Sequence, residues 1–234
     1  MRFLRLATLF LVLYGSIACN VLLGQDASTL VYDPYYREDQ FYLGSTYNFW
    51  TRLPEGLAQR NFSYGVLGGF IRDMPINLKR TISFGFGLGY GYNNYYSNLR
   101  VVEEQLVENY VIVDETIDYK RNKLVTHTLE FPLELRWRNS NPSDYSFWRM
   151  YAGFKMGYNL VSRSKFVTST LTETLSNRDI ESWQYGLTFS AGYNAFTLHL
   201  YYGLNSLFDQ GIVLATGSNL EVRPLRFGLI FYIL

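Results

Sequence analysis

Residues 222–234 read Val-Arg-Pro-Leu-Arg-Phe-Gly-Leu-Ile-Phe-Tyr-Ile-Leu, and their alternation indicates the fold class. Side chains of an extended strand point to opposite faces with a period of two. One face of this stretch carries Leu225, Phe227, Leu229, Phe231 and Ile233. The other face carries Arg226, Gly228 and Tyr232. This pattern predicts a strand that separates an apolar environment from a small or polar one.

The composition favours many strands over a helical enzyme. The chain has 234 residues, enough for one domain, and includes 21 Tyr, 17 Phe, 4 Trp and 19 Gly. Its formal net charge of +1 gives no sign of nucleic-acid binding. Mean hydropathy is near zero, which is too polar for a helical membrane protein. A transmembrane barrel agrees with this value because half of each strand faces inward.

The first residues predict an export signal. Arg2 and Arg5 supply a positive start, and residues 6–14 supply a short apolar run. This run is shorter than the ~20 residues that a membrane-spanning helix needs, which disfavours an anchor. We therefore expect a signal peptide over residues 1–24 and a periplasmic tail over residues 25–39.

Two cleavage sites remain open. Ala18 ends a small-x-small sequence, and Gly24 is the second candidate. Cys19 is the single cysteine and a candidate for lipidation, although Ser16 stands where a lipobox has Leu or Val. If Cys19 is removed with the signal, the mature protein has no thiol, which suits an oxidising envelope.

Eight segments alternate between apolar and small or polar residues. They lie near Gln40–Trp50, Phe62–Arg72, Arg80–Asn93, Lys123–Arg138, Phe147–Arg163, Trp183–Asn194, Phe196–Leu207 and Val222–Leu234. The third is the clearest, because its even positions from Ile82 to Tyr92 are large aliphatic or aromatic residues and four of its odd positions are glycine. A glycine face is expected inside a narrow closed barrel, where other side chains need the room.

A soluble eight-stranded barrel is the alternative architecture. Its outward face would be polar, whereas here the wider stripe is apolar and the charged residues fall on the opposite face. We therefore predict an all-β fold with one eight-stranded antiparallel transmembrane β-barrel over residues 40–234. Such a barrel after a signal peptide indicates the cell outer membrane.

The connections between the segments alternate in length. Short or turn-rich links lie near 73–79, 139–146 and 194–195, and longer links near 51–61, 94–122, 164–182 and 208–221. Outer-membrane barrels have short turns in the periplasm and long loops outside, so both barrel ends are expected in the periplasm. Aromatic side chains are expected at both membrane interfaces. The predicted girdle comprises Trp137 and Trp148 on the periplasmic side and Trp50, Tyr95, Tyr96 and Trp183 on the outer side.

Four stretches carry a resemblance to a known family. They are Arg-Glu-Asp-Gln-Phe-Tyr (37–42), Gly-Phe-Ile-Arg-Asp-Met-Pro-Ile-Asn (69–77), Leu-Glu-Phe-Pro-Leu-Glu-Leu-Arg-Trp-Arg (129–138) and Gly-Leu-Ile-Phe-Tyr-Ile-Leu (228–234). Together they resemble the small outer-membrane β-barrel proteins of Bacteroidetes, often labelled porin family or PorT-like. The resemblance covers about Arg37 to Leu234. It implies the fold and the compartment, and its founding member PorT links the family to the type IX secretion machinery.

Charged residues on the predicted inward faces form the first candidate site. They are Glu130, Glu134, Arg136, Lys155 and Arg226. They could line a polar pathway or form ion pairs that fill the barrel. Eight strands enclose an interior that side chains just fill, and buried charges need partners. We expect an internal network in which both glutamates pair with at least one of the three cations. The two carboxylates lie ~13 Å apart along one strand, too far for glycosidase chemistry.

Catalytic signals are weak. A lipid-modifying barrel enzyme would need a nucleophile and a base at the outer rim. His127 is expected there, facing outward, but without a serine at a suitable spacing. His199 is expected in the interior network, and neither histidine belongs to a metal-binding cluster. The sequence predicts no enzyme, cofactor or metal.

Residues 98–123 are the best candidate for a protein interaction. They hold six acidic side chains around a short apolar run. The segment could form a hairpin above the membrane or a solvated loop. We expect a non-enzymatic structural, assembly or secretion-accessory protein whose partners are outer-membrane lipid and proteins of such a machine, with no nucleic acid. The alternatives are a small-solute porin and, less favoured, a lipid-modifying enzyme.

Overall fold

The computed structural model describes residues 39–77, 79–104, 107–114, 117–139, 148–194 and 196–233. The expected signal peptide over 1–24, with Cys19 and both cleavage sites, lies outside the described residues, as does the expected tail up to residue 38. No helix in the described ranges is long and apolar enough to cross a membrane.

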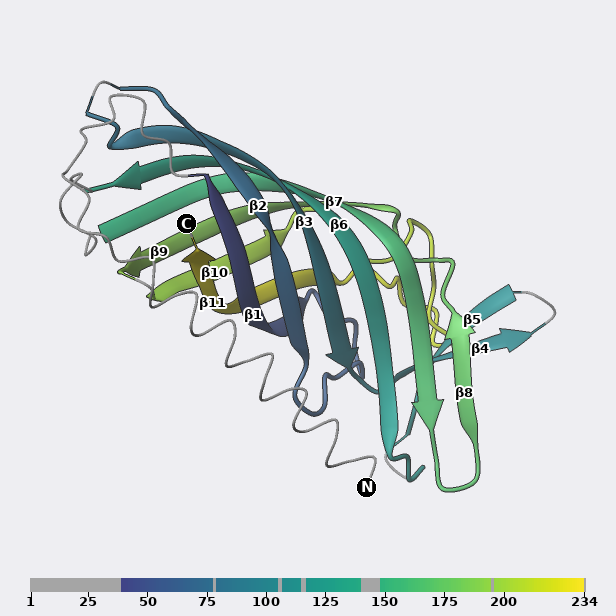
Figure 1. The fold of residues 1–234 in the computed structure, drawn as a ribbon. Helices are drawn as coiled ribbons and strands as arrows, with labels where there is room; N and C mark the ends of the chain where they lie inside the picture. Colours follow the sequence, from purple (N-terminus) through teal and green to yellow (C-terminus); the bar gives the residue numbers. More distant parts are fainter. Residues whose placement is uncertain are drawn as a thin grey trace, which may run out of the picture. The chain divides into compact units, whose positions relative to one another are not determined.

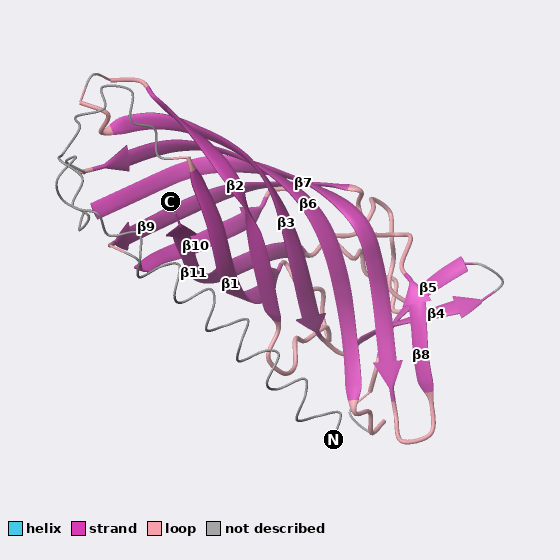
Figure 2. Ribbon diagram, viewed as in Figure 1, coloured by secondary structure: helices cyan, strands magenta, loops and turns pink. Residues whose placement is uncertain are grey.

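Eight antiparallel strands form a closed barrel (Figures 1 and 2). They are β1 (Gln40–Thr51), β2 (Tyr64–Pro75), β3 (Ile82–Tyr96), β6 (Arg121–Arg138), β7 (Trp148–Val167), β9 (Trp183–Tyr193), β10 (Phe196–Gly203) and β11 (Arg223–Ile233). The order around the barrel is β6-β3-β2-β1-β11-β10-β9-β7, and β6 pairs with β7 to close it. The predicted eight-stranded antiparallel barrel is confirmed.

The strands run in the predicted places with shifted ends. β2 continues to Pro75, where the sequence indicated a turn, so that Asp73 faces the interior. β7 continues to Val167, well past the predicted end at Arg163. The register of the β6–β7 pair shifts between His127 and Thr128, as it does at a β-bulge, where one strand carries an extra residue. Paired residues on both sides of this shift still point to the same face of the barrel.

The outward face of the barrel is apolar. On β11, the exposed residues Phe227, Leu229, Phe231 and Ile233 alternate with less exposed neighbours, as the sequence predicts. On β6 the outward face extends from Trp137 to His127, which is about 26 Å along the barrel axis at ~3.4 Å per residue and a ~40° tilt. This height matches the ~25 Å apolar band of outer-membrane barrels.

Glycines let the interior close around an aromatic side chain. A Cβ atom added at Gly89 would lie 2.0 Å from the Tyr42 hydroxyl, and one added at Gly69 would lie 2.7 Å from the same oxygen. The glycine face of β3 therefore leaves room for Tyr42 of β1. Tyr42 packs there in a small core with Leu67, Ile71 and Ile230.

The three remaining strands lie beyond the barrel, at the end with the long connections, here called the outer end. β4 (Leu99–Glu104) and β5 (Val107–Ile112) pair as a separate two-stranded sheet, so the segment near 98–123 forms a hairpin. β8 (Thr172–Ser176) pairs with the end of β7. Figure 1 shows β6, β7 and β8 extending side by side past the end of β3.

Candidate functional site

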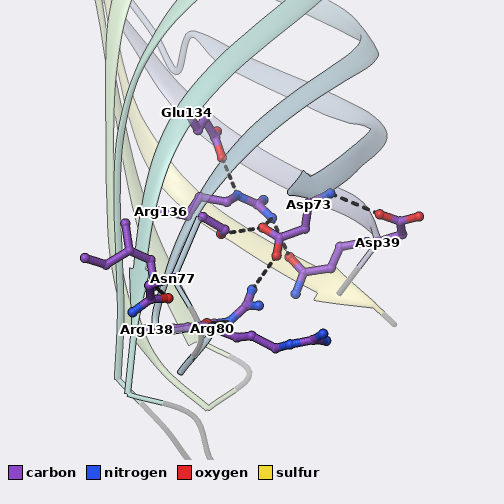
Figure 3. A network of polar contacts seen from close by, with 10 residues as sticks. Asp39, Asp73, Asn77, Arg80, Glu134, Arg136 and Arg138 are labelled. Atoms are coloured by element: carbon purple, nitrogen blue, oxygen red, sulfur yellow. Dashed lines mark hydrogen bonds and ion pairs between the residues drawn. The ribbon is translucent and has the colours of Figure 1, made fainter. Parts of the chain in front are cut away.

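A cluster of charges fills the barrel near its short turns (Figure 3). We call Asp73, Glu134, Arg136 and Arg138 the turn-side cluster. Arg138 contacts Asp73 at 2.8 Å, and Arg136 contacts Asp73 at 3.3 Å and Glu134 at 3.0 Å. The Ser83 hydroxyl donates a further hydrogen bond to Asp73 at 2.7 Å. All four charged side chains are buried, so these contacts replace water for each of them.

A second group of charges lies midway along the barrel. This mid-barrel cluster consists of Glu130, Lys155 and Arg226. Lys155 Nζ lies 2.8 Å from one Glu130 oxygen, and Arg226 lies 3.5 Å from the other. The guanidinium of Arg226 also packs 4.6 Å from the centre of the Tyr201 ring. One carboxylate thus contacts cations from two other strands, β7 and β11.

The structure divides the predicted inward charges between these two clusters. Glu130 lies with Lys155 and Arg226, whereas Glu134 lies with Arg136. The candidate set omitted Asp73 and Arg138. Arg138 already lay on the predicted inward face of its strand, and Asp73 follows Ile71 at a spacing of two residues on the inward face of β2. Extending the alternation past Arg72 would have identified Asp73.

A small cavity adjoins both clusters inside the barrel. A cavity of about 10 Å³ lies between them and is lined by Tyr42, Glu134, Lys155, His199 and Tyr232 among others. This volume holds about one water molecule. Eight strands enclose an interior that side chains just fill, and here ion pairs and aromatic rings fill it.

The long connections pack together over the outer end of the barrel. Their buried apolar residues, together with those at the adjoining strand ends, form what we call the cap core, which includes Trp50, Leu57, Tyr95, Tyr110, Ile180, Leu207, Phe208, Leu214 and Leu220. Trp50 stacks on Tyr95 with ring centres 5.4 Å apart, and Phe208 packs edge-on against Tyr110 at 5.4 Å. These contacts join β1 and β3 of the barrel to β5 and to the connection over 204–222.

The prediction is wrong for two residues of the aromatic girdle. Trp50 and Tyr95 are 4% and 0% exposed and belong to the cap core, not to the lipid-facing surface. Trp50 follows Thr46 and Asn48 on the inward face of β1. At the outer end that face meets the cap, so a large apolar side chain is buried there instead of at the interface.

The other girdle residues lie on the outside of the barrel. Trp137, Trp148 and Trp183 are 44%, 59% and 42% exposed. Trp183 packs against Tyr158 of β7, and Trp148 packs against Tyr193 of β9. Tyr96 is partly exposed beside Lys123.

A serine–histidine contact lies inside the barrel. Ser190 Oγ and His199 Nδ1 are 2.8 Å apart, across the β9–β10 pair. The sequence placed His199 in the interior but gave no signal for its partner, because the two residues meet only through strand register. Both are buried, at 1% and 2% exposed, and His199 also lines the 10 Å³ cavity. In this structure the pair is therefore closed to solvent.

His127 lies on the outward face, as its position in the alternation predicts. Its ring contacts the Tyr90 hydroxyl and packs edge-on against Tyr92 at 5.3 Å. Its partners are therefore tyrosines of β3. This surface is an aromatic one near the outer edge of the apolar band.

Burial and acidic neighbours raise the pKa values of two carboxyl groups in the cap. Burial raises the pKa of the Glu108 carboxyl, and the nearby charge of Asp179 adds to the increase. Burial also raises the pKa of Asp209, with Glu181 and Asp179 contributing. Glu108 accepts a hydrogen bond from the Arg178 backbone N–H at 2.8 Å, which ties β5 to the connection after β8.

Comparison with known families agrees with this geometry. The family model for the outer membrane protein beta-barrel domain matches residues 25–209. A search of curated proteins found no significant match.

Proposed function

The chain belongs to the outer membrane protein beta-barrel domain family, and we propose that it is a non-conducting, non-enzymatic accessory or structural protein of the outer membrane. The main support for this proposal is that the barrel is blocked at two heights along its axis. Charge clusters fill the interior, and the cap core packs over the outer end. With the interior occupied, the parts available for function are the lipid-facing wall and the surface of the cap.

A small-solute porin is disfavoured by the ion pairs themselves. A conducting path would have to pass Glu130, Lys155 and Arg226, which are each no more than 5% exposed. Separating buried partners leaves uncompensated charges in a dry interior, which costs several kcal/mol. The cap core would have to open as well.

A lipid-modifying enzyme is also disfavoured. Such an enzyme needs an accessible nucleophile at the membrane surface, with a base beside it. The Ser190–His199 pair is buried, and the outward His127 contacts Tyr90. Lipid A that is unchanged in a deletion strain would agree with the proposal. Loss of one lipid A modification, restored only by a chain with intact His127, would contradict it.

The cap offers a surface for protein partners. The β4–β5 hairpin carries exposed Glu103 and Asn109 on a scaffold held by the cap core. The resemblance to PorT-like barrels makes a secretion or assembly machine the partner that we propose. The proposal rests on an outer surface supported by the cap core and on an interior filled with ion pairs.

Site-specific photo-crosslinking in intact cells tests this role. A photoreactive phenylalanine analogue at Asn109 places the probe on the exposed hairpin. The matched control places it at Leu198, which is 51% exposed on the lipid-facing wall. We expect discrete protein adducts from position 109 and none from position 198. Secretion-machine components would select the PorT-like role. Absence of adducts from every cap position would contradict a cap-based accessory role.

A further inference from the structure

Four cations share one outward surface at the outer end of β6 and β7. Lys123 of β6 stands directly opposite Lys165 of β7, Arg163 stands opposite Val125, and Arg121 stands opposite Val167. Directly paired residues of an antiparallel ladder point to the same face. Arg121, Lys123, Arg163 and Lys165 therefore form one surface, which we call the basic patch.

No carboxylate neutralises the basic patch within the part of the chain that the structure describes. None of its four cations lies in an ion pair there, although other surface cations do: Arg100 contacts Glu173 at 2.8 Å. Glu173 stands opposite Phe166, which is buried, so this acid faces the cap and not the patch. Lys123 and Lys165 stand directly opposite each other, and such a like-charge pair is destabilising unless an anion lies between the two side chains.

The neighbouring strand supplies hydroxyl groups to the same face. Thr174 of β8 stands opposite Lys165, and Ser176 stands opposite Arg163. Both are exposed. On the other side, Lys123 Nζ lies 5.8 Å from the centre of the Tyr96 ring. Cations with hydroxyl donors beside them form a surface suited to phosphate oxygens.

The basic patch lies at the height of the lipid headgroups. Lys123 is four residues beyond His127, where the apolar band ends, which is about 10 Å along the axis at ~3.4 Å per residue and a ~40° tilt. Headgroup layers occupy roughly 5–8 Å on each side of the hydrocarbon core. The lysine and arginine side chains can reach back across the small difference.

We propose that the basic patch binds the phosphate-bearing headgroup of an outer-leaflet lipid. Lys123 and Lys165 contact the phosphate, Arg121 and Arg163 flank it, and Thr174 and Ser176 donate hydrogen bonds to it. The acyl chains then lie against the apolar wall of β6 and β7 below the patch. This inference needs the barrel in the membrane but does not depend on the accessory role.

Native mass spectrometry of the detergent-solubilised full chain tests the site. The probes are bis-phosphorylated lipid A and the same lipid with both phosphates removed. The test variant is K123Q/K165Q, and the matched control is R52Q/R223Q, which removes two cations at the outer end of β1 and β11. Each Lys or Arg near an anionic lipid surface contributes to the binding free energy, and the loss of two is expected to lower the affinity for the phosphorylated lipid about thirtyfold.

We expect wild type and R52Q/R223Q to prefer the phosphorylated lipid and K123Q/K165Q to lose that preference. Heat-modifiable gel migration checks that each variant is folded, and the single change Lys165→Gln replaces the double variant if that one does not fold. Retention of the preference in the folded lysine variant would overturn the site. Equal displacement of the lipid by millimolar inorganic phosphate would overturn its assignment to a lipid headgroup.

Discussion

Arg226 Nε donates a hydrogen bond of 3.1 Å to the Tyr95 hydroxyl, while another nitrogen of the same guanidinium lies 3.5 Å from Glu130. Tyr95 stacks in turn on Trp50 of the cap core. One side chain thus links the mid-barrel cluster to the apolar layer that covers the outer end. Charge pairing inside and apolar packing above therefore stabilise one continuous closed structure.

The mid-barrel cluster predicts unequal costs for single and paired substitutions. Glu130→Leu leaves Lys155 and Arg226 buried without their carboxylate, so we expect a loss of about 3–5 kcal/mol in the free energy of unfolding. The double change Glu130→Gln with Lys155→Met removes one charge of each sign and should cost less than the single change. Urea titration in lipid vesicles, followed by tryptophan fluorescence, measures both. A double variant less stable than Glu130→Leu would contradict the pairing.

Asp73 is expected to make a large contribution to the stability of the barrel at its turn side. It contacts both Arg136 and Arg138, and all three side chains are almost fully buried. Asp73→Asn keeps the size of the side chain but removes the charge, so two guanidinium groups lose their shared partner. We expect a destabilisation of about 3–5 kcal/mol in the same titration.

The exposed Glu55 provides the control for Asp73. Glu55→Gln makes the same chemical change on a surface connection, where substitutions usually stay within about 0.5 kcal/mol. Equal effects of the two changes would mean that the charge of Asp73 contributes nothing to stability.

Neighbouring glycines of β2 should respond differently to one added methyl group. A Cβ atom at Gly69 would lie 2.5 Å from the Leu88 carbonyl oxygen and 2.6 Å from the Gly89 Cα, both backbone atoms. At Gly68 the nearest atoms lie at 3.4 Å, an ordinary contact. We expect Gly69→Ala to cost about 1–3 kcal/mol and Gly68→Ala to be tolerated. Thermal gel-shift curves compare them, and a reversed order would contradict the assigned faces of β2.

The closed cap should be more stable at acidic than at neutral pH. Burial raises the pKa of Glu108 and of Asp209 in the folded cap, so the closed form binds these protons more tightly than an open form. Stability is then greatest below the ordinary carboxyl pKa and falls as the pH rises through the raised pKa values. Hydrogen exchange of residues 99–112 and 204–222, corrected for intrinsic rates, should show more protection at pH 4 than at pH 7.

Glu108→Gln tests the origin of this pH effect. The amide keeps the size of the side chain and can still accept the Arg178 hydrogen bond, but it does not titrate. The difference in protection between the two pH values should shrink in this variant. An unchanged difference would assign the effect to other groups.

The barrel was predictable because its signal is periodic. Alternation along Ile82–Tyr92 or Leu225–Ile233 fixes which side chains face lipid, and it places Glu130 and Glu134 on the inward face without further information. Chain order and turn length then determine which strands pair. The inward charges follow from the same period, apart from Asp73, whose strand was predicted to end too early.

The cap was not predictable by the same reasoning. Its core joins Trp50 of β1, Tyr110 of β5 and Phe208 of the connection over 204–222, which are far apart in the chain, and such packing has no period in the sequence. Trp50 was therefore predicted at the lipid interface. The Ser190–His199 contact also depends on the register between two strands, which the residue pattern alone does not determine.

Single-channel recording in planar bilayers tests the central claim most directly, because it asks whether the filled and capped barrel passes ions. Purified, folded full-length protein is predicted to insert without sustained conductance, since the two charge clusters and the cap core occupy the path. Stable openings of uniform size in the wild-type protein would contradict the account.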